Sequence, residues 1–93
     1  MIQGFACKET EKIYNGTHSR KLPNDIQRVA RRKLIYLDEA DNIEDLRVPP
    51  ANYLEKLKRD RKGQWSIRIN DKWRICFNWK GINASNVEIV DYH

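Results

Sequence analysis

Large apolar residues alternate with small, polar or cationic residues between positions 64 and 79. The apolar residues form two runs, Trp65, Ile67 and Ile69, then Trp73, Ile75, Phe77 and Trp79. The residues between them are Ser66, Arg68, Arg74, Cys76 and Asn78. A period of two predicts β-strands with one face in the core and the other face free. Because the two runs are adjacent, they predict an antiparallel hairpin.

The connection between the two runs determines which residues lie opposite each other. A three-residue loop pairs Ile69 with Trp73, and therefore Arg68 with Arg74 on the other face. A two-residue loop would place the polar Asn70 opposite Trp73, on the face that the tryptophan buries, so we expect the longer loop. Two arginines directly across a hairpin repel each other. We therefore expect an anionic group between them.

A regular apolar spacing in the first half of the chain predicts an amphipathic helix of about four turns, with Pro23 in its first turn. The apolar stripe of this helix consists of Ile26, Val29, Ala30, Leu34 and Leu37. Two shorter helices are predicted on either side of it. One covers residues 10–15 and ends at Gly16, and the other covers residues 42–46 with Asp41 as its N-cap.

Three further strands are predicted, at residues 2–7, 53–58 and 86–92. Pro49 and Pro50 predict an extended chain before the second of them, and a turn is predicted at residues 81–85. This order of elements predicts an α+β fold: a mostly antiparallel sheet of about four to five strands, with two to three helices packed on one face. A chain of 93 residues forms one modest core, so residues 1–93 are expected to be a single domain.

Charge is distributed unevenly along the chain, which has a formal net charge of +5. Residues 51–80 hold nine cations and three anions, whereas residues 38–45 hold five acids and no cation. A basic surface favours a polyanionic partner, and nucleic acid is the commonest such partner for a cytoplasmic domain. Many small basic domains bind no nucleic acid, however, so composition alone leaves both interpretations open.

The sequence contains no apolar run long enough to span a bilayer and no N-terminal series typical of a secretion signal. Cys7 and Cys76 lie far apart, with no other Cys or His near them at metal-ligand spacing. We therefore expect reduced thiols, no metal site, no membrane association and a cytoplasmic location.

Several residue types that catalyse RNA cleavage are predicted on the free face of the sheet. Lys58 ends one predicted strand, Arg68 and Arg74 lie on the hairpin, and Tyr92 and His93 end the sequence. Cleavage through the 2′-hydroxyl needs a base, an acid and a group that stabilises charge on the phosphate. His, Tyr and Glu can transfer the protons, and Arg and Lys can stabilise the charge. An ordinary charged surface is the alternative, because residue types alone do not establish geometry.

Residues 57–77 and 87–93 together resemble the HigB branch of the RelE superfamily, the toxins of bacterial type II toxin–antitoxin pairs. The resemblance extends over the whole chain, including the N-terminal Ile-x-x-Phe segment, the central helix, the Pro-Pro pair and the closing Asp-Tyr-His. It implies a RelE-like fold. It also implies an endoribonuclease without metal or cofactor, which cleaves translated mRNA in the ribosomal A site and inhibits translation and growth.

The resemblance also implies several partners. A helix-turn-helix antitoxin of the HigA type neutralises such toxins, and the toxin binds operator DNA only through the antitoxin complex. The remaining partners are mRNA on the 70S ribosome and ribosomal RNA. The alternative is a non-catalytic basic module that binds RNA or acts only as a co-repressor with its antitoxin.

Matched by position to the family's motifs, the catalytic candidates are Lys58, Arg68, Arg74, Tyr92 and His93. The candidates for contact with RNA or the ribosome are Arg59, Arg61, Lys62, Asn70 and Lys72. Some members carry their first arginine where this chain has Asn70, so Arg68 is a departure from that pattern. Some relatives also carry a histidine where this chain has Glu55, which leaves the general base open. A regular strand would point Glu55 to the opposite face from Lys58.

Overall fold

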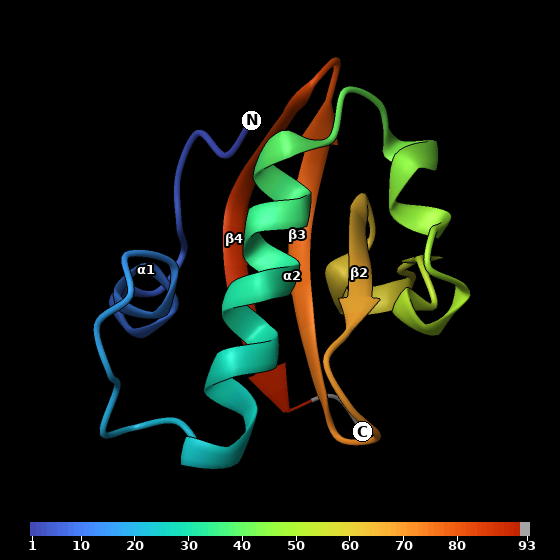
Figure 1. Ribbon diagram of the computed structural model, residues 1–93. Helices are drawn as coiled ribbons and strands as arrows, with labels where there is room; N and C mark the ends of the chain where they lie inside the picture. The colour runs from blue at the N-terminus through green and yellow to red at the C-terminus, as the bar shows by residue number, and fades with distance from the viewer. Residues whose placement is uncertain (92–93) are drawn as a thin grey trace.

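The computed structural model describes residues 1–91, which form a four-stranded antiparallel sheet with α-helices on one face (Figure 1). The strands lie in chain order: β1 (Glu55–Lys56), β2 (Gln64–Arg68), β3 (Trp73–Lys80) and β4 (Asn83–Asp91). The helices are α1 (Lys8–Tyr14) and α2 (Gln27–Glu39), with short 3-10 helices η1 (Asn24–Ile26), η2 (Ile43–Arg47), η3 (Pro50–Asn52) and η4 (Arg59–Arg61). The predicted α+β fold is thus confirmed. No helix in this part of the chain is long and apolar enough to cross a membrane.

The central hairpin has the predicted register. Arg68 lies opposite Arg74, and the backbone N–H of Ile69 donates to the carbonyl of Trp73 at 2.9 Å. The side chain of Asn70 closes the loop, because its Oδ1 accepts the backbone N–H of Trp73 at 2.8 Å. The period of two and the loop length together were therefore sufficient to place both arginines on one face.

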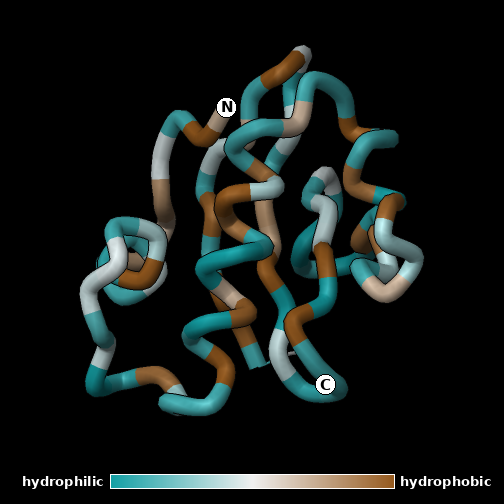
Figure 2. The backbone as a smooth tube through the Cα atoms, viewed as in Figure 1, coloured by the Kyte–Doolittle hydropathy of each residue, from teal (hydrophilic) through white to brown (hydrophobic). Residues whose placement is uncertain are grey.

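Helix α2 packs its apolar stripe against the sheet, and Ala30, Leu34 and Leu37 are fully buried in this contact. The sheet contributes Ile67, Ile75, Phe77, Ala84, Val87 and Ile89 to the same core. Hydrophobic positions recur along the helix and along the strands beneath it (Figure 2). The three tryptophans are half-buried around this core, as expected for the apolar face of the hairpin. Burial of each large aliphatic side chain stabilises the fold by about 1.5–3 kcal/mol.

The N-terminal segment lies along β4 without forming the predicted strand over residues 2–7. Ile2 and Phe5 each form an isolated parallel bridge, to Ala84 and Val87 respectively. Between these two points the backbone of β4 bulges at Asn86, whose φ is +51°. Continuous pairing is interrupted there because a bulged edge does not present a regular row of hydrogen-bonding groups.

The ends of the predicted helices are confirmed in one case and shifted in another. Gly16 follows α1 with a φ of +84°, as expected for a residue that ends a helix. The cap of η2 is Asn42, one residue later than predicted. Its Oδ1 accepts the N–H of Glu44 at 2.8 Å, and Asp45 accepts the N–H of Asn42 at 3.2 Å. These two hydrogen bonds satisfy the backbone N–H groups of Glu44 and Asn42 at the start of η2.

Three predictions for the loops around the sheet were wrong in part. The chain is extended at Val48 and Pro49, as predicted, but not beyond them, because Pro50 takes the first position of η3, which suits its fixed φ. The strand predicted at residues 53–58 is reduced to β1, since Tyr53 has a φ of +45° and η4 follows soon after. The turn predicted at residues 81–85 is also shorter. Gly81 supplies a φ of +65°, and β4 already begins at Asn83.

Lys33 is a buried cation on the core side of α2, which the apolar spacing did not predict. Its side chain is almost fully enclosed, and its Nζ donates a hydrogen bond to Oδ1 of Asn52. Asn52 is itself fully buried, and its Nδ2 donates to the carbonyls of Leu46 at 3.1 Å and Val48 at 3.4 Å. This network fastens η3 to α2 and so fixes the start of the segment that leads into β1.

The buried lysine predicts a pH-dependent stability. Burial, with a smaller contribution from Arg32, lowers the pKa of Lys33. Below this lowered pKa, Lys33 is charged in both states, and the buried ammonium destabilises the folded state. This destabilisation decreases as the pH rises toward the pKa that Lys33 has in the unfolded chain. The free energy of unfolding should therefore increase as the pH rises toward the pKa of a lysine in the unfolded chain, about 10.4, relative to that of Lys33→Met.

Urea unfolding of both proteins at each pH measures this difference. The two proteins share every other titrating group, so the titration of other residues cancels in the comparison. A difference that is constant or falls with pH would contradict the lowered pKa of Lys33.

Candidate active site

The face of the sheet away from α2 carries three cross-strand rows of side chains. The pairs are Arg68 with Arg74, Ser66 with Cys76, and Gln64 with Asn78. Successive rows lie about 7 Å apart, because alternate residues of a strand point to the same face. The arginine row and the amide row therefore stand at opposite ends of this face, with two small, fully buried residues between them.

Tyr53 contacts both members of the arginine row. The Arg74 Nη2 donates to the backbone carbonyl of Tyr53 at 2.6 Å. The guanidinium carbon of Arg68 lies 5.1 Å from the centroid of the Tyr53 ring, within the range of a cation–π contact. Arg68 also forms an ion pair with Asp71. The anionic group expected beside the arginines thus comes, for Arg68, from the hairpin loop.

Strand β1 brings Glu55 to the same face as the arginines. Glu55 lies opposite Ser66, whose side chain is in the row next to Arg68 and Arg74. Its charge and that of Arg74 both act on the thiol of Cys76, whose pKa is raised chiefly by burial. A carboxylate and two guanidinium groups therefore share one side of the sheet.

The expectation that Glu55 and Lys58 point to opposite faces depended on a strand that is regular as far as Lys58. That condition is not met, because β1 ends at Lys56 and the chain turns into η4. Glu55, Lys56, Lys58 and Arg59 instead line one cavity of about 480 Å³. Glu55 and Lys58 therefore border the same cavity.

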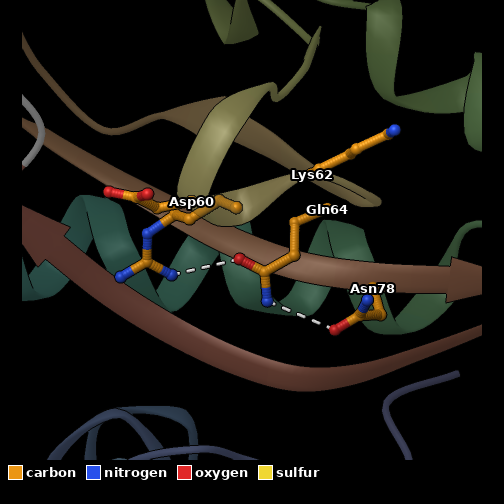
Figure 3. A pocket seen from close by; sticks show the side chains of 5 residues that line it. Asp60, Lys62, Gln64 and Asn78 are labelled. Atoms are coloured by element: carbon orange, nitrogen blue, oxygen red, sulfur yellow. Dashed lines mark hydrogen bonds between the residues drawn. The ribbon is translucent and has the colours of Figure 1, made fainter.

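The amide row opens onto a second, polar cavity of about 430 Å³, shown in Figure 3. Nη1 of Arg61 donates to Oε1 of Gln64 at 3.0 Å and pairs with Glu88 at 3.3 Å. Nε2 of Gln64 in turn donates to Oδ1 of Asn78 at 3.2 Å. Arg61, a predicted RNA contact, is thus half-buried and tied to β2 and β4, so it fastens η4 to the sheet. The neighbouring Lys62 is exposed.

The other predicted RNA contacts surround the arginine row or the first cavity. Arg59 is exposed with a φ of +60°. Asn70 and Lys72 are exposed in the hairpin loop, where the Lys72 Nζ lies 3.5 Å from Asp91. The two remaining catalytic candidates, Tyr92 and His93, lie outside the described residues.

Sequence reasoning missed Tyr53 as a member of this site. The residue was expected inside a regular strand, and no motif marks it. Its contacts with Arg68 and Arg74 depend on the left-handed backbone conformation that follows η3, which residue types alone do not reveal.

The assembled groups suit the chemistry of a phosphodiester. Guanidinium groups donate paired hydrogen bonds to phosphate oxygens and stabilise negative charge that grows there. A carboxylate can accept a proton from an attacking hydroxyl. Residues 1–91 contain no group of three His, Cys, Asp or Glu side chains that could hold a metal ion.

Comparison with known proteins relates the whole chain to one family. The sequence profile of a family described as RelE-like toxin of type II toxin–antitoxin system HigB matches residues 3–93. The protein named Toxin HigB-1 from Vibrio cholerae is 40% identical over 80 residues, covering 85% of this chain and 84% of that protein. The protein named Endoribonuclease HigB from Proteus vulgaris is 33% identical over the full length of both chains.

Proposed function

Because the chain belongs to the HigB-like family of RelE-like toxins from type II toxin–antitoxin systems, we propose that it is an endoribonuclease. Its substrate is mRNA under translation, which it cleaves in the ribosomal A site in the cytoplasm without a metal ion. A HigA-type helix-turn-helix antitoxin neutralises it, and the complex of the two binds operator DNA. The name of the relative from Proteus vulgaris supports RNA cleavage as the activity.

The observation that carries this proposal is the placement of Arg68, Arg74 and Glu55 on one face of the sheet. In the proposed reaction the 2′-oxygen of one nucleotide attacks the adjacent phosphorus, and the bond from phosphorus to the 5′-oxygen breaks. Glu55 accepts the proton of the 2′-hydroxyl, and the two guanidinium groups stabilise the charge on the phosphate oxygens. The acid that protonates the 5′-oxygen is His93 or Tyr92.

The exposed cations around this face support a substrate presented by the ribosome. Lys58, Lys62 and Lys72 lie on loops beside the sheet and Arg59 begins η4, and all four are exposed. Such side chains bind phosphates of ribosomal RNA without regard to sequence. Binding of the toxin to the ribosome would orient the mRNA, so positioning supplies a large part of the rate.

Primer extension on a defined mRNA in a reconstituted translation system tests the proposal. The purified protein should produce cuts within codons when ribosomes are present and none on the same mRNA alone. Removal of His93 should weaken or abolish the cuts if this residue is the acid. A folded protein that produces no cuts would overturn the nuclease and leave the basic RNA-binding or co-repressor module.

A further inference from the structure

Tyr53 presents an aromatic ring to solvent directly beside the arginine row. The residue is 59% exposed, although tyrosine rings in folded proteins usually bury most of their apolar surface. The guanidinium of Arg68 lies against the ring at 5.1 Å. A ring that is stacked on a cation and still largely exposed has room for a second flat group.

The backbone holds the ring in this place from both sides. Tyr53 has a φ of +45°, a conformation that tyrosine rarely adopts. Its N–H donates to the carbonyl of Pro50 at 3.0 Å, and its own carbonyl accepts from Arg74 at 2.6 Å. The preceding residue, Asn52, is fixed by its contact with the buried Lys33. The backbone that carries the ring is therefore held between α2 and the arginine row.

The surrounding charges indicate which flat group this would be. Two guanidinium groups lie within contact of Tyr53, and the cavity lined by Lys56, Lys58 and Arg59 begins a few residues further along the chain. A single strand of RNA alternates phosphates with bases, so a strand held by these cations brings a base next to the ring. Aromatic side chains beside basic grooves bind single-stranded nucleic acid in this way.

We propose that Tyr53 is a stacking platform for a nucleobase next to the phosphate held by Arg68 and Arg74. The base lies on the ring face opposite the Arg68 guanidinium, which gives a stack of guanidinium, ring and base. The proposal rests on the RNA substrate proposed above and adds a base-binding subsite to it. Because stacking uses only the flat face of the base, the subsite selects little by hydrogen bonding.

The test uses a short single-stranded oligoribonucleotide with 2′-O-methyl groups, which cannot be cleaved through the 2′-hydroxyl. Fluorescence anisotropy measures its affinity for the protein. The same measurement is then made on a series of oligonucleotides, each of which has one abasic position. For the wild-type protein, one abasic position should weaken binding by between about fivefold and a hundredfold. Tyr53→Phe should keep this sensitivity, because the ring remains.

Tyr53→Asn removes the ring and tolerates the left-handed φ, so the backbone carbonyl stays available to Arg74. This variant should bind the complete and the abasic oligonucleotides equally. Tyr53→Gly repeats the comparison with a second residue that suits the same conformation. Tyr36→Ala is the matched control, because Tyr36 is an exposed tyrosine on α2, and it should behave as the wild type.

Two outcomes overturn the stacking proposal: no abasic position weakens binding by the wild-type protein, or the sensitivity persists in Tyr53→Asn and Tyr53→Gly. The oligonucleotide is never cleaved, so this result is separate from the nuclease test. Base-dependent binding without cuts on the ribosome would overturn the nuclease proposal alone. Cuts on the ribosome, with no effect of the Tyr53 variants on binding to abasic oligonucleotides, would overturn the stacking proposal alone.

Discussion

Replacing Arg74 with alanine is expected to slow mRNA cleavage on the ribosome by about two to three orders of magnitude. Arg74 lies on the inner strand β3, with Arg68 opposite it on β2 and Val90 opposite it on β4. Its contact with the carbonyl of Tyr53 fixes its direction. A preorganised donor of this kind stabilises charge in the transition state without any rearrangement. Quantitative primer extension at several times gives the rate.

Two variants separate this effect from general loss of charge or fold. Arg74→Lys keeps the charge and loses the paired hydrogen bonds, so its rate should fall between those of the wild type and Arg74→Ala. Lys80→Ala removes an exposed cation from the end of the same strand and should leave the rate within about threefold. If Arg74→Ala cleaves as fast as Lys80→Ala, the arginine row is not the phosphate site.

Glu55→Gln is expected to lower the cleavage rate by about a hundredfold or more, since it keeps the shape of the side chain and removes the proton acceptor. Single-turnover rates on programmed ribosomes measure this effect.

The matched control for this prediction is Glu88→Gln. Glu88 lies on the same face, opposite Cys76, but its carboxylate pairs with Arg61 at 3.3 Å, away from the arginine row. We expect this variant to keep the wild-type rate. A wild-type rate in Glu55→Gln would instead place the general base elsewhere in the toxin or on the ribosome.

The hairpin was predictable because its information is local and periodic. Alternation fixed the faces, and the loop length fixed the register, so the pairing of Arg68 with Arg74 followed from the sequence. The amphipathic α2 was predictable for the same reason. In both elements a shift by one residue would bury charge or expose a large apolar surface, which leaves one arrangement strongly favoured.

The segment between α2 and β2 was not predictable, because tertiary contacts determine its shape. The burial of Lys33 depends on a partner 19 residues away, Asn52, which no local pattern identifies. The hydrogen bond between Lys33 and Asn52 also fixes the backbone just before Tyr53, which contacts the arginines, and β1 after it is only two residues long. The placement of Glu55 on the same face as Arg74 therefore became visible only when the short β1 was paired with β2.

The N-terminal segment also determines how this sheet meets other protein chains. The bridges from Ile2 and Phe5 occupy the outer side of β4, and Thr10 accepts the N–H of Ile89 further along it at 3.0 Å. At the other side of the sheet, β1 is only two residues long and carries a lysine. Long unpaired strands invite aggregation and strand addition, and short or covered ones resist both. Within residues 1–91 both edges of the sheet are thus short or covered, which disfavours edge-to-edge addition of strands from other chains.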